Sequence, residues 1–108
     1  MFDKQKMLNT LGLCQRGRKL VYGDELLPAI TKNKVYAVVL ADNASERTRK
    51  QIQDKCNTAG IPVIGGVTRE ELSWSIGMTN RVAVGVSDRG FSKVFKSYLV
   101  ERGDVVSE

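Results

Sequence analysis

The sequence predicts an α/β protein in which helices cover both faces of a mixed four-stranded sheet, an α/β/α three-layer sandwich. Short apolar runs rich in β-branched residues alternate along the chain with amphipathic segments of helical period. Alternation of this kind is typical of layered α/β domains. The chain has 108 residues, enough for one hydrophobic core. We therefore expect one domain at residues 1–100 and a frayed tail at 101–108.

The first half of the chain is expected to form helix, strand, helix and strand, in that order. Residues 3–16 carry apolar side chains at i, i+4 and i+7, the period of an amphipathic helix. "KLVY" predicts a short strand that ends at Gly23, and a short second helix follows it and ends in the basic run "TKNK". "VYAVVLA" at 35–41 is almost continuously apolar, as expected for a strand covered on both faces. The apolar positions of the two helices are Met7, Leu11 and Cys14, and then Leu26, Leu27 and Ile30.

A third helix and a third strand come next. Asn43 and Glu46 have the spacing of a capping box, so the helix should begin there, and Gly60 should end it. The buried stripe of this helix is expected at Thr48, Ile52, Cys56 and Ala59. "IPVI" then predicts a strand, which the paired glycines Gly65 and Gly66 follow.

The remaining elements are a helix, a strand and a long last helix. Thr68 and Glu71 form a second capping box, and the helix that they start has Leu72 and Ile76 on its apolar face and stops at Gly77. "RVAVGVS" predicts the fourth strand. The last helix can be capped by Asp88, and its apolar positions are Phe91, Val94, Phe95, Tyr98 and Leu99.

The composition excludes several kinds of function. Histidine is absent, so a Ser/His/Asp or Cys/His site cannot form and the commonest metal ligand is missing. Cys14 and Cys56 each fall on an apolar helix face, so we expect buried thiols in a reducing compartment rather than a zinc site. No apolar run approaches the ~18 residues of a membrane helix. The start of the chain does not resemble a signal peptide either. We expect a cytoplasmic protein with no membrane partner, metal or cofactor.

The charge of the chain favours an anionic partner. The net charge is +5 and the pI is about 9.4, and nucleic acid is the usual partner of a small basic domain. Arg16, Arg18 and Lys19 place three cations within four residues just before the first strand. They can contact phosphate, or they can reflect the preference of helix ends for cations. Gly23 is either a turn glycine or a position where the backbone approaches a ligand.

A second candidate loop is "IGGVTRE", which contains Gly66, Val67, Thr68 and Arg69. Val67 is expected to be exposed beside the basic Arg69, an arrangement that suits packing against a splayed RNA base. The alternative is a plain connection with Val67 in the core.

Two further features have a structural interpretation first. In "ERTRK", the cations Arg47, Arg49 and Lys50 are expected to form a solvated helix face. Trp74 lies off the apolar stripe of its helix, and we expect core or half-buried packing there, with base stacking as the less favoured alternative.

Together these blocks resemble the family of ribosomal proteins L-seven-Ae and L-thirty-e, and within it the short bacterial YlxQ-like members. The resemblance rests on "LGLCQRGRKLVYGDEL", "VVLADNASERTRKQIQDKC", "IPVI", "REELSWSIG" and "RVAVGVSDRGF", in the family's order and at close to its spacing. It covers nearly the whole chain. It implies an α/β/α protein that binds kink-turn or related bent RNA, with a glycine-led helix start placed at tandem sheared G·A pairs and a second loop packed on a flipped-out nucleotide.

Carried onto this chain, the resemblance implies that Gly23 is the family's glycine and Lys19 the basic residue before its first strand. It also implies that Gly66, Val67 and Thr68, followed by Arg69, form the second loop. Asp24 is expected to cap the helix, and Glu25 could accept a hydrogen bond from a guanine amino group. Lys32 and Lys34 could supply positive charge at the end of that helix.

The chain departs from the family pattern after Gly23. Leu26 stands where the pattern has Glu or Gln, and Ala29 stands where it has Lys. Pro28 has no N–H to donate, so the second helix should start late or have a distorted first turn. Because each good base-edge contact is worth ~1–3 kcal/mol, loss of two would leave binding that is weaker, more salt-dependent and less selective.

Three functions follow from these observations. The leading hypothesis is a non-catalytic, cytoplasmic RNA-binding protein of the ribosomal-protein type, a monomer when free, whose expected partner is structured RNA, with ribosomal RNA as the favoured kind. The alternative is a protein-interaction module derived from the same fold, motivated by the acids of "GDEL". An enzyme is the least favoured, because the sequence contains no GxGxxG motif, P-loop or metal cluster.

Overall fold

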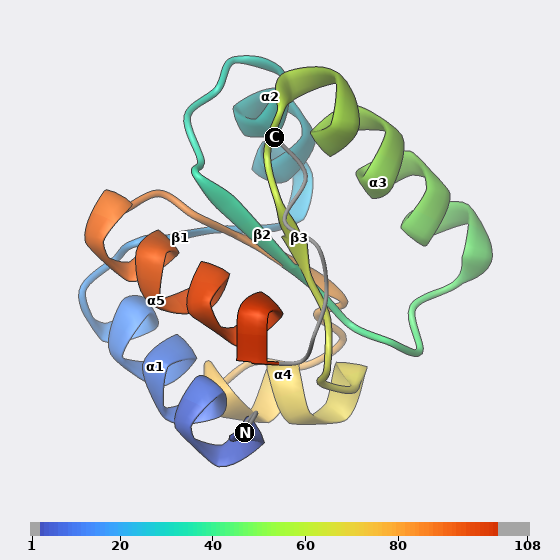
Figure 1. The fold of residues 1–108 in the computed structure, drawn as a ribbon. Coiled ribbons are helices and arrows are strands. Elements are labelled where there is room, and N and C mark those ends of the chain that lie inside the picture. Colours follow the sequence, from blue (N-terminus) through green and yellow to red (C-terminus); the bar gives the residue numbers. More distant parts are fainter. Residues whose placement is uncertain (1–2, 102–108) are drawn as a thin grey trace.

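The computed structural model of the protein describes residues 3–101 and has a four-stranded sheet between two layers of helices (Figure 1). The helices are α1 (Lys4–Arg16), α2 (Leu26–Thr31), α3 (Glu46–Ala59), α4 (Arg69–Ser75) and α5 (Arg89–Glu101), with a 3₁₀ helix η1 (Gly23–Glu25) directly before α2. The strands are β1 (Leu20–Val21), β2 (Ala37–Leu40), β3 (Val63–Ile64) and β4 (Ala83–Val86).

The sheet is mixed, as the sequence predicts. Its strand order is β1, β4, β2, β3. β2 and β3 are parallel, whereas β4 runs antiparallel to both β1 and β2. Therefore β1, β2 and β3 all point the same way, and their carboxyl ends meet at one edge of the sheet together with the amino end of β4.

The helices form two layers, which confirms the predicted three-layer sandwich. α2 and α3 pack against each other on one face, and α1, α4 and α5 lie on the other (Figure 1). Gly85 of β4 lets α2 approach the sheet closely. A Cβ there would lie 2.8 Å from Val35 Cγ1 and 2.9 Å from Leu26 Cδ1, so any side chain at this position would force the layer apart.

The core follows the predicted periodicities. Every residue of β2 and β4 is buried, as expected for central strands covered on both faces. Cys14 and Cys56 are buried and free, as predicted. Burial raises the pKa of the Cys14 thiol to about 12, with the Asp88 carboxylate adding to the effect, and it raises the pKa of Cys56 to about 11. Both thiols are therefore protonated and unreactive at neutral pH.

Several details at the helix ends and at the tail differ from expectation or lie outside the structure. The cap of α3 is Ser45, whose Oγ accepts from the Thr48 N–H, so the capping box predicted from Asn43 and Glu46 is wrong. Val94 of α5 is 39% exposed, at the margin of the predicted apolar face. The Leu99 side chain and residues 102–108 of the predicted tail lie outside the described residues.

Candidate nucleic-acid interface

Loops from four different strands meet where β1, β2 and β3 end. We call this surface the carboxyl edge. Its residues are Gly23, Asp24, Glu25, Asp42, Asn43, Gly66, Thr68, Arg69 and Arg81. The strand directions place the two loops that the sequence singled out, after β1 and after β3, at the same edge. In layered α/β sheets, ligands collect at such carboxyl ends.

Gly23 opens η1 with a backbone that only glycine adopts easily. Its φ is +68°, in the left-handed region. A Cβ at Gly23 would lie 3.3 Å from Arg81 Nη1, so the guanidinium of Arg81 lies directly beside this turn. Arg81 also stacks over the Tyr22 ring, with Cζ 5.1 Å from the ring centroid. The structure thus puts a cation and an aromatic ring next to the glycine.

Sequence reasoning missed Arg81. Its backbone N–H donates to Ser73 Oγ at 2.8 Å, which ties the segment before β4 to α4. Arg81 Nε is buried and has no hydrogen-bond partner among the residues that the structure describes. The sequence signal was only an arginine before an apolar run, and nothing local to it pointed to Gly23, which lies 58 positions earlier in the chain.

The first turn of the second helix is distorted, as Pro28 predicts. It is the 3₁₀ helix η1, and α2 proper has only six residues. The expectation that Asp24 caps the helix is wrong, because the residues at the cap positions, Tyr22 for η1 and Glu25 for α2, make no side-chain cap hydrogen bond. Asp24 and Glu25 are instead exposed. Their carboxylates are open to solvent and to a ligand.

Side-chain hydrogen bonds join the loop after β2 to the loop after β3. Asp42 Oδ1 accepts from the Gly66 N–H at 2.9 Å. Asn43 Oδ1 accepts from the Arg69 N–H at 2.7 Å, and Asn43 Nδ2 donates to Glu70 Oε1 at 3.0 Å. The hydrogen bond from Asn43 is the main reason that the pKa of Glu70 lies below its usual value. Asn43 therefore supports the start of α4, not that of α3.

The predicted capping box at the start of α4 is confirmed. Thr68 Oγ1 accepts from the Glu71 N–H at 3.1 Å, and the Thr68 N–H donates to Glu71 Oε1 at 2.9 Å. The backbone hydrogen bond from Thr68 is also the main cause of the lowered pKa of Glu71. The expectation that Val67 is exposed is wrong. Its side chain is 1% exposed, because the loop turns inward between Gly66 and Thr68 to fill the core.

A small pocket lies beside Gly23, between α2, α3 and the start of β4. Its volume is about 170 Å³. The residues that line it are Gly23, Leu26, Leu27, Thr48, Ile52, Asn80, Arg81, Val82 and Ala83. The lining is largely apolar, and its polar members are Thr48, Asn80 and Arg81.

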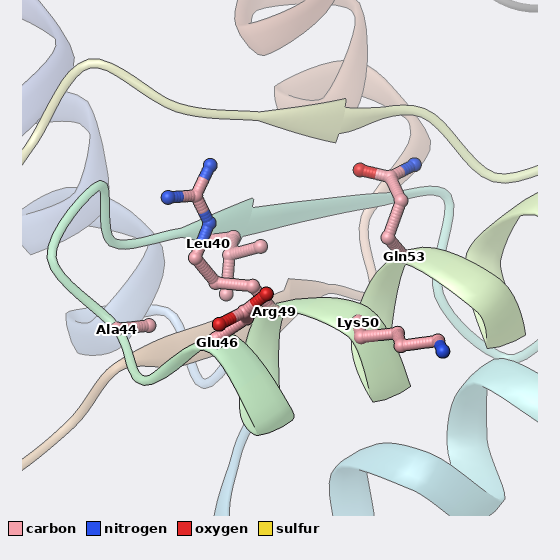
Figure 2. A pocket seen from close by; sticks show the side chains of 6 residues that line it. All are labelled: Leu40, Ala44, Glu46, Arg49, Lys50 and Gln53. Carbon is pink, nitrogen blue, oxygen red and sulfur yellow. The ribbon is translucent and has the colours of Figure 1, made fainter.

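An open groove of about 640 Å³ lies between the end of β2 and α3. Leu40, Arg49, Lys50 and Gln53 contribute to its lining, and Figure 2 shows Lys50 pointing away from Arg49 and Gln53. Arg49 Nη1 donates to the Asp42 carbonyl oxygen at 3.2 Å, so this cation braces the loop after β2. Arg47, Arg49 and Lys50 are all exposed, as expected for a solvated face.

The remaining predicted cations lie at the opposite edge of the sheet. Lys19 precedes β1, and its carbonyl oxygen accepts from the Ser87 N–H at 2.8 Å, just past the carboxyl end of β4. α2 carries the chain away from Gly23, so Lys32 and Lys34 lie near the amino end of β2. The structure therefore does not bring Arg16, Arg18, Lys19, Lys32 and Lys34 to the carboxyl edge.

Trp74 differs from expectation. It is 76% exposed on α4, although core or half-buried packing was predicted. Among the described residues, no group of three or more histidine, cysteine or acidic side chains could hold a metal ion. No described helix is long and apolar enough to cross a bilayer.

Comparison with known proteins decides the family. A model of the ribosomal protein L7Ae/L30e/S12e/Gadd45 family matches residues 5–96. The chain belongs to this family. An RNA-binding protein YlxQ from Enterococcus faecium is 35% identical over 98 residues, which cover 90% of this chain and 94% of the relative. An RNA-binding protein YlxQ from Bacillus subtilis (strain 168) is 39% identical over 90 residues, 82% of this chain and 90% of the relative.

Two solved structures share the fold of this chain. A protein with unknown function from Bacillus halodurans C has a TM-score of 0.80 at 36% identity and covers 86% of this chain and 95% of its own. The Giardia lamblia 15.5kD RNA binding protein has a TM-score of 0.75, covering 91% of this chain and 85% of its own. At 14% identity the latter shares the fold with this chain.

Proposed function

We propose that the protein is a non-catalytic RNA-binding protein that recognises kink-turn or related bent RNA at the carboxyl edge. The observation that carries this proposal is the juxtaposition of Gly23, Arg81 and Tyr22. A glycine turn without Cβ lets the RNA approach the backbone, and the neighbouring guanidinium supplies a cation. Membership of the L7Ae family, and relatives named for RNA binding, support the same function.

The acids beside Gly23 determine which part of an RNA can approach. Asp24 and Glu25 are exposed, and their carboxylates repel a phosphate backbone. They accept hydrogen bonds from base amino groups. Sheared G·A pairs present base edges in a widened groove, so an RNA of that shape can place amino donors near Glu25 and keep its phosphates at a distance.

The pocket beside Gly23 offers a second contact. At about 170 Å³ it is smaller than the ~300–1,000 Å³ typical of small-molecule sites, and it suits a single unstacked base. Its apolar lining can pack on the face of a base while Asn80 and Arg81 meet the base edge or the adjoining phosphate. With the Val67 side chain buried, this pocket takes the place of that side chain as the surface for a flipped-out nucleotide.

The protein should discriminate between RNAs with and without G·A pairs less sharply than a family member that has the full sequence pattern. Leu26 and Ala29 are buried, 4% and 7% exposed, so neither can reach a base edge. Two missing contacts of ~1–3 kcal/mol each remove much of the preference for G·A pairs. The positive charges of Arg69 and Arg81 can still contact the phosphates that flank the site. We place this activity on ribosomal or other translation-associated RNA, in the cytoplasm, with the free protein monomeric.

A titration with two RNAs tests the proposal. One RNA carries a kink-turn with tandem sheared G·A pairs, and the other has these pairs replaced by Watson–Crick pairs. We expect the first to bind more tightly at physiological salt. Equal affinity for both would refute kink-turn recognition and leave general RNA binding. Capture of a protein from cell extract that survives nuclease treatment, with neither RNA bound, would support a protein-interaction module instead.

A further inference from the structure

The edge of the sheet opposite Gly23 carries a cluster of cations. We call it the basic edge, and its residues are Arg16, Arg18, Lys19, Lys32, Lys34 and Arg89, all exposed. The two ion pairs of the described residues, Lys4–Glu71 and Arg69–Glu70, both lie elsewhere. The acid of this region is Asp88, whose Oδ2 is engaged by the Phe91 N–H at 2.9 Å. None of these six cations forms an ion pair with a described residue, although Asp88 lies near them and Asp24 and Glu25 line a groove together with Lys32 and Lys34.

Strand pairing brings these cations close together. Leu20 pairs with Val86, which also pairs with Ala37, so Lys19 and Tyr36 lie two strand spacings apart, ~10 Å. The Arg89 guanidinium stacks over the Tyr36 ring, with Cζ 5.2 Å from the centroid. Three segments far apart in sequence therefore present positive charge on one side of the sheet.

The ends of α1 and α2 show that this charge is not an incidental property of helix ends. α1 to α4 all end in a similar turn, in which one residue adopts a left-handed conformation and the N–H of the next residue donates to the carbonyl five residues earlier. The left-handed residues are Arg18, Asn33, Gly60 and Gly77, in that order. Thus α3 and α4 use glycine, the favoured residue, and have no cation in the turn that ends them. In contrast, α1 has Arg16, Arg18 and Lys19 at its end, and Lys32 and Lys34 follow α2 directly.

Arg18 makes the contrast quantitative. Its φ is +58°, and a left-handed conformation costs a non-glycine residue ~1–2 kcal/mol. A cation near a helix carboxyl end gains only ~0.3–1 kcal/mol from the helix dipole. The dipole therefore does not compensate for an arginine at this position. A binding role for the Arg18 guanidinium explains why arginine stands at a position where glycine would be more stable.

The two edges are separated by a strand and by acidic side chains. Lys19 and Gly23 are separated by the extended segment of β1, a span of ~13 Å. A groove of about 350 Å³ connects the edges along α2, but Asp24 and Glu25 line it as well as Lys32 and Lys34. An RNA phosphate backbone that follows the groove from the basic edge therefore meets acids before it reaches Gly23.

We propose that the basic edge binds the phosphate backbone of a second RNA segment, so that one molecule of the protein holds two RNA segments at opposite edges of its sheet. Binding of the first segment at the carboxyl edge rests on the proposed function. Binding of the second segment at the basic edge does not depend on it. The chemistry is that of phosphate recognition without base readout. Arginine and lysine pair with phosphate oxygens, and each contact makes affinity fall with salt, with a logarithmic slope of ~0.7–0.9.

A two-RNA binding experiment tests this proposal. The protein is saturated with unlabelled kink-turn RNA, and a labelled plain duplex without G·A pairs is then titrated by fluorescence anisotropy. We expect the loaded protein to bind the duplex, with a steep salt dependence. The variant that combines Lys19→Glu with Lys34→Glu should lose at least about tenfold in duplex affinity. The matched control combines Lys6→Glu with Lys50→Glu, exposed cations that do not belong to the basic edge, and should lose less than about threefold.

Each outcome separates this inference from the proposed function. Competition between the duplex and the kink-turn RNA would overturn the second surface and leave the first. Equal losses in the two charge-reversal variants would overturn it as well. Duplex binding that depends on Lys19 and Lys34, with no preference for the kink-turn, would support the basic edge and refute kink-turn recognition. Loss of binding to phosphatidylserine vesicles, with duplex binding unchanged, would assign the edge to a membrane surface and overturn the RNA partner.

Discussion

The two edges of the sheet are built by different means. At the carboxyl edge, loops are tied to one another by side chains such as Asp42, Asn43 and Thr68, and acids lie among the cations. At the basic edge, the turns after α1 and α2 are held by backbone hydrogen bonds, and the side chains left over are cations. The first edge offers shape and directed hydrogen bonds, and the second offers charge alone. We infer that the first selects an RNA and the second only holds one.

The largest effect that would test this contrast is expected from Arg81→Ala. Loss of the guanidinium beside Gly23 should weaken kink-turn binding by about fivefold to 150-fold, the range of one specific contact of ~1–3 kcal/mol. Binding of a plain duplex at the basic edge should change by less than about threefold. Anisotropy titrations with both RNAs measure this difference. A parallel loss for both RNAs, in a variant that denaturant unfolding shows to be folded, would show that the two edges act as one surface.

The next effect concerns the glycine turn. Gly23→Ala forces a side chain into the left-handed region and should lower the free energy of unfolding by about 1 kcal/mol. Gly60→Ala, at φ +72° with open space around it, is a matched control with the same backbone strain. Urea unfolding should give similar losses for the two variants, whereas kink-turn affinity should fall only for Gly23→Ala. An equal drop in kink-turn affinity in both variants would show that Gly23→Ala acts through lost stability and not through the binding surface.

A smaller effect, of opposite sign in stability, is expected at the basic edge. Arg18→Gly relieves the left-handed strain and should raise the free energy of unfolding by about 0.5–1 kcal/mol. It should also reduce the slope of log affinity against log salt for a plain duplex by about 0.7–0.9. Asn33→Gly is the control, because asparagine tolerates this conformation and little stability is gained. An unchanged salt slope in Arg18→Gly would show that Arg18 is not part of the RNA-binding surface.

The smallest effect is the response of the carboxyl edge to acid. The pKa values of Glu70 and Glu71 are lowered in the folded protein by the hydrogen bonds from Asn43 and Thr68. Their contribution to stability is therefore fully present above the unfolded pKa of about 4.5 and is lost as the pH falls through the folded values. Urea unfolding at pH 7 and at decreasing pH below 4.5 measures the loss, and Glu71→Gln should reduce the pH dependence. An unchanged dependence in that variant would exclude Glu71 as a cause.

Much of the fold was predictable because it depends on local patterns. The helix periodicities, the two buried thiols and the Thr68–Glu71 capping box were all predicted from spacing alone and are confirmed. Pro28 correctly predicted a distorted first turn before α2, since the lack of an N–H is a property of the residue itself. These features need no knowledge of what lies across the sheet.

The errors in prediction arose where a side chain chooses between partners that are distant in sequence. Asn43 satisfies the start of α4 and not that of α3, because the loops after β2 and β3 are neighbours only once the strands pair in parallel. Val67 is buried and Trp74 exposed, the reverse of what their surroundings in sequence suggested. Arg81 was missed for the same reason, since its neighbour Gly23 is brought to it by the pairing of β1 with β4.

The sequence by itself determined the order of the elements, the apolar faces that they bury and the excess of positive charge. It could do so because periodicity and composition are properties of short stretches of chain. The tertiary structure alone decided that the charge is divided between two edges. That division depends on the directions of the four strands, which are set by long-range pairing and packing.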